Sequence, residues 1–159
     1  MGKAVPSPMT TARLLALLIP AALLAGAWIS QIVFGLAPCE MCHWQRWPHY
    51  AALIPALAAF VAPPATRPKL IIIAALLIAV SGAIGAFHAG VEYGWWEGLT
   101  TCAAPSAASL EDLLNAPLIR CDVAPWDLWG VSLAGFNAIF SLGGAALIVA
   151  LLRKSRTAA

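Results

Sequence analysis

Four long apolar stretches are the feature that most constrains the fold of this 159-residue chain. At ~1.5 Å of rise per helical residue, each stretch is long enough to cross a hydrocarbon layer of ~30 Å. The sequence is 62% apolar and 10% charged, whereas soluble domains are roughly 25% charged. Its net charge of +2 and its lack of a basic block exclude nucleic-acid-binding proteins. We therefore predict an all-α integral membrane protein of one domain, an antiparallel bundle of four transmembrane helices over about residues 14–36, 43–62, 70–88 and 128–152.

The first apolar stretch has a second interpretation as a signal peptide. Lys3 and Arg13 precede the apolar run, and Ala25-Gly26-Ala27 resembles a signal-peptidase site. The run continues nine residues beyond that site, which favours an uncleaved span. Either outcome leaves the following segment on the same side of the membrane.

The third predicted span carries small residues at four-residue spacing, in Ser81-Gly82-Ala83-Ile84-Gly85-Ala86. Small side chains at this spacing let two helices approach closely inside a membrane. The stretch therefore predicts tight packing against a neighbouring helix.

Lysine and arginine gather at one end of the predicted bundle. Seven of the nine lie in the terminal segments and in the connector after the second span, and all seven acidic residues lie on or near the opposite side. Because positively charged segments stay in the cytoplasm, we expect cytoplasmic termini and outer loops at about residues 37–42 and 89–127. The four cysteines would then face the periplasm from a bacterial inner membrane. The seven cations are Lys3, Arg13, Arg67, Lys69, Arg153, Lys154 and Arg156.

A Cys-x-x-Cys pair, Cys39 and Cys42, stands where the second predicted span begins. If Cys39 caps that helix, then Cys42, Arg46 and His49 share a sector of roughly 80° with it. A helix N-terminus and a nearby guanidinium both lower a cysteine pKa below ~8.5. A disulfide across so short a gap stabilises little by chain entropy. The pair therefore predicts a site of thiol–disulfide exchange.

The other two cysteines, Cys102 and Cys121, enclose a loop of about twenty residues in the second outer segment. A structural disulfide is one interpretation of this pair. Two pairs on one side of a small membrane protein also suggest a relay in which exchange passes electrons between them. No Rossmann fingerprint or iron–sulfur run is present, so we expect a lipid-soluble quinone as the electron acceptor.

Polar and aromatic side chains near the first pair are candidates for a quinone pocket. The tryptophans fit an interfacial belt equally well. His88 and Glu92 are four residues apart, so they can face each other on a helix and deliver the protons that a reduced quinone takes up. Alternatively, His88 and Glu92 are interfacial residues in contact with water and have no role in proton delivery. The candidate residues are Trp44, Arg46, Trp47, His49, His88 and Glu92.

Other interpretations of Cys39 and Cys42 stay open. His43 completes a Cys-x-x-Cys-His run, the signature of c-type haem attachment, but attached haem would consume both thiols. A zinc site completed by His43, His49 or the other two cysteines is geometrically possible, although Arg46 would repel a cation. We expect neither metal nor haem. An alternative function from another class is a non-catalytic metal-binding or assembly protein with structural disulfides. A further alternative, a conduit that supplies reductant to the periplasm, would need cysteines inside the spans.

The residues around the cysteines resemble the DsbB family of disulfide-generating membrane oxidases, and the likeness covers essentially the whole chain. It rests on Cys39-Glu40-Met41-Cys42 followed by Gln45-Arg46-Trp47, on one cysteine pair in each outer loop, and on the run Trp126-x-x-Trp129-Gly130-Val131-Ser132 before the last span. The resemblance implies four spans and a protein-dithiol:quinone oxidoreductase.

The resemblance also implies a role for each cysteine. The Cys102–Cys121 disulfide would oxidise a soluble periplasmic thioredoxin-like partner of the DsbA type, with Cys102 forming the mixed disulfide. Cys121 would exchange with Cys39, and Cys42 would pass electrons to ubiquinone or menaquinone near Arg46. His88 lies near the position of a quinone-affecting histidine in the family. One branch of the family serves dedicated substrate proteins. The sequence does not separate this branch from the rest of the family.

Overall fold

The structure is a computed structural model that describes residues 6–100 and 119–157. In these residues it has four long helices and one two-stranded hairpin, so the prediction of an all-α protein is confirmed for this part of the chain. Cys102 and most of the second outer loop lie outside the described residues. The elements are α1 (Pro8–Ile32), α2 (Glu40–Val61), α3 (Arg67–Glu92), β1 (Asp127–Leu128), β2 (Val131–Ser132) and α5 (Leu133–Thr157).

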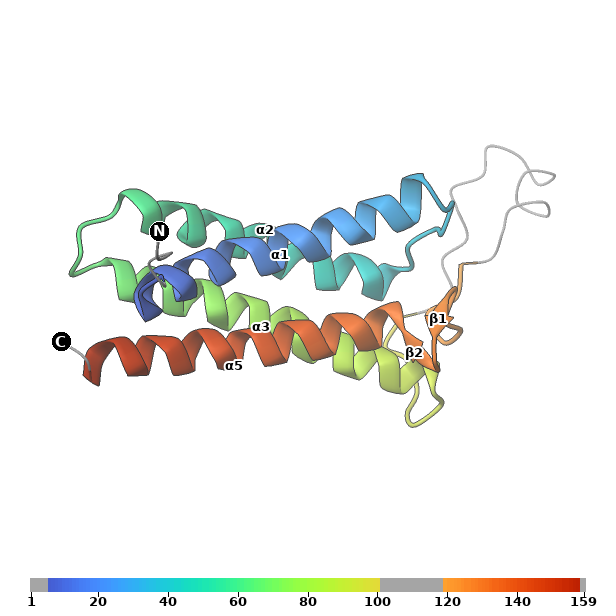
Figure 1. The fold of residues 1–159 in the computed structure, drawn as a ribbon. Coiled ribbons are helices and arrows are strands. Elements are labelled where there is room, and N and C mark those ends of the chain that lie inside the picture. The colour runs from blue at the N-terminus through green and yellow to red at the C-terminus, as the bar shows by residue number, and fades with distance from the viewer. Residues whose placement is uncertain (1–5, 101–118, 158–159) are drawn as a thin grey trace.

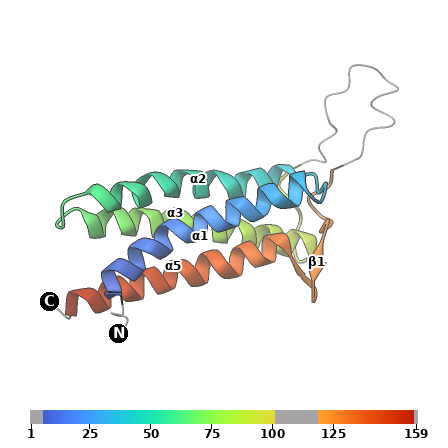
Figure 2. The ribbon, with the colours of Figure 1, turned by 45° about the horizontal axis from the view of Figure 1, so that its top comes forward.

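The four helices lie side by side, and consecutive helices run in opposite directions (Figure 1). Helix α3 packs against α2 and α5, and α1 packs against the same two helices from the other side. The start of α1 and the end of α5 are at one end of the bundle, while the hairpin is at the other (Figure 2). The segment that carries the first cysteine pair, between α1 and α2, is also at the hairpin end.

Small side chains fill most of the core between the helices. Alanines from all four helices are buried there, together with Ile71, Ile78 and Ile148. Helices α1, α3 and α5 are long and apolar enough to cross a membrane. Helix α2, the expected second span, is not among them, because its first turns carry charged and polar residues such as Glu40 and Arg46. A membrane crossing by α2 therefore stays a prediction.

All four helices begin at different residues from the predicted spans, and the difference is largest for α1 and α5. Helix α1 starts at Pro8 rather than at residue 14, because Ser7 caps it and accepts a hydrogen bond from the N–H of Thr10 at 3.2 Å. Helix α5 starts at Leu133 rather than at residue 128. The preceding residues turn back on themselves at Trp129 and Gly130, whose φ values are 53° and 78°, and this turn joins β1 to β2.

Helices α3 and α5 approach each other most closely at two glycines of α3. A Cβ atom on Gly85 would lie 2.9 Å from both the carbonyl oxygen of Ala134 and Nδ2 of Asn137. A Cβ atom on Gly82 would lie 2.9 Å from Ser141. The tight packing predicted from the small residues of this span is thereby confirmed. It brings the polar side chains of α5 against α2 and α3.

Candidate functional site

Cys39 caps α2, as its spacing from Cys42 predicts. Its backbone is extended, with φ −74° and ψ 173°, and its Sγ accepts a hydrogen bond from the N–H of Cys42 at 3.3 Å. The two Sγ atoms lie 2.9 Å apart. Both sulfurs therefore stand at a helix N-terminus, where the helix dipole stabilises negative charge.

The contact between the two sulfurs makes the two thiols unequal. It raises the pKa of Cys39, and burial of this thiol acts in the same direction. The same contact lowers the pKa of Cys42, with a smaller contribution from the positive charge of Arg46. Because its pKa is the lower of the two, Cys42 is the thiol of this pair that ionises first. Both cysteines lie before residue 43, where the second predicted span begins.

Cys121, from the second outer loop, lies next to Cys39. The Sγ atoms of both cysteines and Nε2 of His88 all lie within 4.8 Å of one another, and all three residues are buried. His88 Nε2 is 3.5 Å from the Cys39 sulfur and 3.2 Å from the carbonyl oxygen of Cys121. One cysteine from each predicted pair therefore meets at one buried histidine. We call Cys39, Cys42, His88 and Cys121 the thiol cluster.

The described cysteines, Cys39, Cys42 and Cys121, are free thiols in this structure. The hydroxyl of Thr100 donates a hydrogen bond to the sulfur of Cys121 at 3.2 Å. The predicted pairing of Cys121 involves Cys102, which lies outside the described residues.

Glu92 follows His88 by one turn of α3 and faces it. Its Oε1 lies 3.8 Å from His88 Nε2, and both side chains are 2% exposed. The other carboxylate oxygen accepts a hydrogen bond from the hydroxyl of Ser132 in β2. The two residues expected to face each other do so, but beside the thiol cluster, away from the apolar cavity described below.

The tautomer of His88 follows from its hydrogen bond with Gln45. Gln45 Nε2 donates to the carbonyl oxygen of Met41 at 3.2 Å, and it lies 2.8 Å from His88 Nδ1. An amide nitrogen only donates, so His88 Nδ1 is the acceptor. The proton of the neutral ring is then on Nε2, the nitrogen that faces Cys39 and Cys121.

This proton position bears on metal binding at the thiol cluster. Two sulfurs and a histidine nitrogen at these separations are a ligand set for zinc or another thiophilic cation. A histidine binds a metal through an unprotonated nitrogen, whereas here Gln45 keeps the proton on the nitrogen in question. The alternative metal sites with His43 or His49 are not formed, since His43 is exposed and His49 bonds to Asn137.

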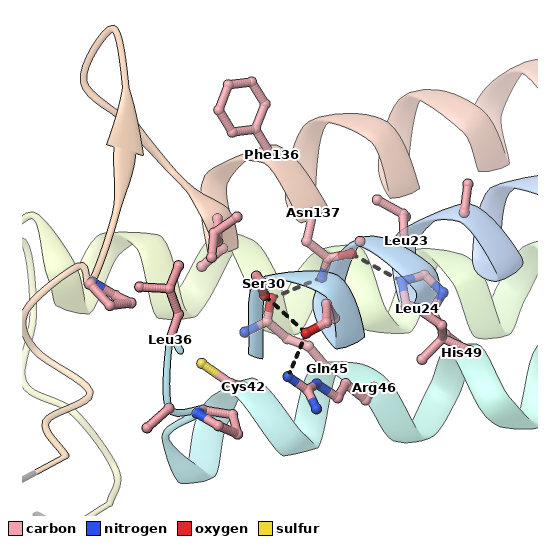
Figure 3. A pocket seen from close by; sticks show the side chains of 18 residues that line it. Leu23, Leu24, Ser30, Leu36, Cys42, Gln45, Arg46, His49, Phe136 and Asn137 are labelled. Carbon is pink, nitrogen blue, oxygen red and sulfur yellow. Dashed lines mark hydrogen bonds between the residues drawn. The ribbon is translucent and has the colours of Figure 1, made fainter. Parts of the chain in front are cut away.

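A cavity of about 180 Å³ lies beside Cys42. The second half of α1, the segment before α2, and the first turns of α2 and α5 surround it (Figure 3). Its walls are mostly apolar. The polar lining residues are Ser30, Cys42, Gln45, Arg46, His49 and Asn137.

Arg46 is 8% exposed and is held in the cavity wall by α1. Its guanidinium donates to Oε1 of Gln31 at 2.7 Å and to the carbonyl oxygen of Ala27 at 3.2 Å. The same group stands over the ring of Trp28, 5.4 Å from its centroid. The arginine thus brings a fixed positive charge to the cavity, and no acidic residue of the described chain forms a salt bridge with it.

The two tryptophans proposed for the pocket do not line this cavity. Trp47 is 69% exposed and meets the edge of Tyr50, and Trp44 is 37% exposed. Their exposure fits the alternative interpretation, an interfacial belt. Of the predicted pocket residues, Arg46 and His49 line the cavity.

Sequence reasoning missed a polar network that joins His49 to the thiol cluster. Asn137 Oδ1 lies 3.0 Å from His49 Nε2, and Asn137 Nδ2 donates to Gln45 Oε1 at 2.9 Å. The same Nδ2 donates to the carbonyl oxygen of Ser81 at 3.2 Å, and Gln45 continues the chain to His88. The available signal was the presence of amide and hydroxyl side chains within apolar helices, where unpaired polar groups are costly.

The family model "Disulfide bond formation protein DsbB" matches residues 9–151. An uncharacterised protein of Rickettsia prowazekii (strain Madrid E) is 21% identical over 127 residues, which cover 75% of this chain and 73% of that protein. No solved structure matches the chain significantly. Since the family match spans nearly the whole chain, including the thiol cluster and most of the cavity, the chain belongs to the DsbB family of disulfide bond formation proteins.

Proposed function

We propose that this chain is a thiol:quinone oxidoreductase that reoxidises a thioredoxin-like, DsbA-type protein in the periplasm and passes the electrons to a membrane quinone. The observation that carries the proposal is the position of Cys39. Its sulfur lies next to Cys121 on one side and next to Cys42 on the other, and Cys42 lines an apolar cavity. A path for exchange therefore leads from the outer loop to the cavity.

The first half of the proposed reaction is thiol–disulfide exchange. The partner dithiol reduces a Cys102–Cys121 disulfide, with Cys102 taking up the mixed disulfide, and becomes a disulfide itself. The Cys121 thiolate then attacks the Cys39 sulfur of a Cys39–Cys42 disulfide, and Cys42 leaves as a thiolate. Attack by Cys102 on Cys121 restores the outer disulfide and leaves Cys39 and Cys42 reduced.

The residues around Cys42 suit a quinone head group. Small-molecule sites are mostly apolar with a few polar groups that fix orientation, and the cavity has this composition. We propose that Arg46 donates a hydrogen bond to one ring oxygen and that His49 lies beside the other. When bound, a quinone supplies the oxidant, because it takes up the two electrons and two protons that Cys39 and Cys42 release as their disulfide re-forms.

His88 holds a proton for the exchange step. Its Nε2–H faces the Cys39 sulfur, so it stabilises negative charge that develops there. Glu92 Oε1 lies next to the same nitrogen. We propose that the Nε2–H of His88, held in place by Gln45, stabilises the thiolates of the thiol cluster as the sulfurs change partners.

The proposed membrane arrangement follows the charges and the bundle. Helices α1, α3 and α5 are apolar enough to cross a membrane. The packing of α2 against α1 and α3 supports α2 as the proposed fourth crossing. Six basic residues of the described chain lie at the end opposite the thiol cluster, namely Arg13, Arg67, Lys69, Arg153, Lys154 and Arg156. This distribution supports a periplasmic position for the cluster in a bacterial inner membrane.

The test uses the full chain in detergent with a reduced thioredoxin-like protein and a short-chain ubiquinone. Loss of quinone absorbance should be rapid for the wild type, absent for Cys42→Ser and slower for Arg46→Ala. A matched control is His43→Phe, because His43 is exposed beside the same cysteine. If the wild type reduces no quinone with any dithiol donor, the proposal is wrong.

A non-catalytic metal-binding or assembly protein is the second candidate, and the ligand set of Cys39, His88 and Cys121 favours it. It predicts a stoichiometric thiophilic metal in the reduced protein and no effect of Arg46→Ala. Metal analysis of the same purified sample therefore separates the two functions.

A further inference from the structure

One ring nitrogen of His49 has a hydrogen-bond partner and the other has none. Nε2 lies 3.0 Å from Asn137 Oδ1, whereas Nδ1 is buried without a partner. The side chain is 3% exposed and lines the cavity. Two other buried side-chain atoms without a partner are found in the described residues, the Nε atoms of Arg13 and Arg67, and neither residue lines the cavity. Among the side chains that line the cavity, His49 is therefore the one with a buried polar atom that lacks a partner.

The hydrogen bonds of Asn137 determine which nitrogen of His49 carries the proton. Asn137 Nδ2 donates to the carbonyl oxygen of Ser81, and a carbonyl oxygen only accepts. The amide oxygen therefore faces His49, and it also accepts from the hydroxyl of Ser141 at 2.9 Å. An acceptor opposite Nε2 requires a proton on Nε2. In the neutral imidazole, Nδ1 then presents a lone pair.

A lone pair on Nδ1 distinguishes the two redox states of a quinone. A quinone has carbonyl oxygens, which only accept hydrogen bonds, while the reduced quinol has hydroxyl groups, which donate. His49 is seven residues after Cys42, roughly 10 Å further along the axis of α2 and on the same face. Figure 3 shows Cys42 and His49 apart from each other in the cavity lining, with Gln45 and Arg46 between them. His49 is thus placed for the ring oxygen farther from the thiols.

We propose that His49 Nδ1 accepts a hydrogen bond from a hydroxyl of the reduced quinol, so that the cavity binds the quinol more tightly than the quinone. Asn137 is a positioning residue that keeps the proton on Nε2. The inference rests on the proposed function and deepens it, since it assigns a preference for one redox state to that same site.

Such a preference would help to drive disulfide formation. Tighter binding of the reduced form raises the reduction potential of the bound couple, by about 30 mV for each tenfold difference in affinity between the two forms. The overall step stays balanced. Cys39 and Cys42 lose two electrons and two protons as two S–H bonds break and one S–S bond forms, and the head group gains both electrons and both protons as two O–H bonds. His49 gains and loses no proton overall.

Binding is measured on the full chain carrying Cys42→Ser, which cannot transfer electrons. Quenching of tryptophan fluorescence by a short-chain ubiquinone, and under anaerobic conditions by its quinol, gives the two dissociation constants. We expect the quinol to bind at least tenfold more tightly. His49→Phe should bring the ratio close to one, and so should Asn137→Leu. The control His43→Phe should keep the ratio.

Two further measurements distinguish a folding defect from the loss of the hydrogen bond at His49 Nδ1. His49→Gln offers both a donor and an acceptor, so it should bind both forms with little preference while remaining folded. Nitrogen NMR of histidine-labelled protein should show His49 protonated at Nε2, with the Nδ1 signal shifting when quinol is added. Protonation at Nδ1 instead, or a preference for quinol that survives in His49→Phe, would overturn the inference.

Failure of the inference is distinguishable from failure of the proposed function. If wild-type protein reduces quinone but shows no preference between the two forms, the inference alone is wrong. If wild-type protein neither binds nor reduces a quinone, the proposed function is wrong and the inference falls with it.

Discussion

His88 Nε2 lies 3.5 Å from the sulfur of Cys39 and 3.2 Å from the carbonyl oxygen of Cys121. The histidine thereby joins α3 to both cysteine-bearing segments. Gln45 accounts for its orientation, because the contact at Nδ1 turns the protonated nitrogen toward the sulfurs. The Nε2–H of His88 therefore stabilises a thiolate on either of the two cysteines.

His88→Phe should therefore slow exchange between the outer loop and Cys39. Loss of a hydrogen bond to a charged group costs about 1.5–3 kcal/mol, which corresponds to roughly 10- to 100-fold in rate. The measurement is a single turnover without quinone, quenched in acid and analysed by mass spectrometry of alkylated peptides. The control His43→Phe should keep the wild-type rate. An unchanged rate in His88→Phe would mean that His88 only fills space in the core.

Cys42 and Cys39 should differ in their pH dependence toward iodoacetamide. The pKa of Cys42 is lowered and that of Cys39 is raised, and the thiolate is the reactive form. In the reduced protein, alkylation of Cys42 should therefore reach its plateau at a lower pH than that of an ordinary thiol. Cys39 should react only at higher pH. Peptide mass spectrometry across a pH series reads both residues separately.

A variant tests the cause of this difference. Cys39→Ser removes the sulfur contact that lowers the pKa of Cys42. In this variant the alkylation of Cys42 should therefore need a higher pH. If Cys42 keeps its profile in Cys39→Ser, the helix N-terminus and Arg46 determine its pKa instead.

The first cysteine pair could be predicted from sequence because its geometry is local. Cys39 and Cys42 are three residues apart, and a cap followed by one helical turn determines where both sulfurs lie. The packing at Gly82 and Gly85 follows equally from spacing within one helix. Local patterns of this kind need no knowledge of which helix is the neighbour.

The polar network could not be predicted in the same way. Gln45 and Asn137 are 92 residues apart in sequence, and their contact depends on the order and rotation of three helices. The hairpin was missed for another reason. Trp129 adopts a positive φ of 53°, which non-glycine residues rarely do. The sequence therefore predicts a span that begins at residue 128, whereas α5 begins at Leu133.

Asn137→Leu should lower the free energy of unfolding in detergent. Leucine has a similar size but pairs with neither Gln45 Oε1 nor His49 Nε2, which Asn137 satisfies in the wild type. Each buried group left unpaired costs about 1–3 kcal/mol. Chemical unfolding followed by circular dichroism measures the change. Ile139→Leu, at an exposed position of the same helix, should stay close to the wild type, and equal stability of both variants would show that the network contributes little.

Gly85→Leu should separate α3 from α5. The side chain would meet the carbonyl oxygen of Ala134 and the amide of Asn137, each 2.9 Å from its first carbon. Overpacking a tight contact costs about 1–3 kcal/mol, and here it also moves Asn137 away from Gln45. Gly143→Leu is the matched control, since nothing lies within 4 Å of a Cβ atom at that position. We expect a lower unfolding midpoint in Gly85→Leu alone, and an equal loss in both variants would show that the loss does not come from the contact of Gly85 with α5.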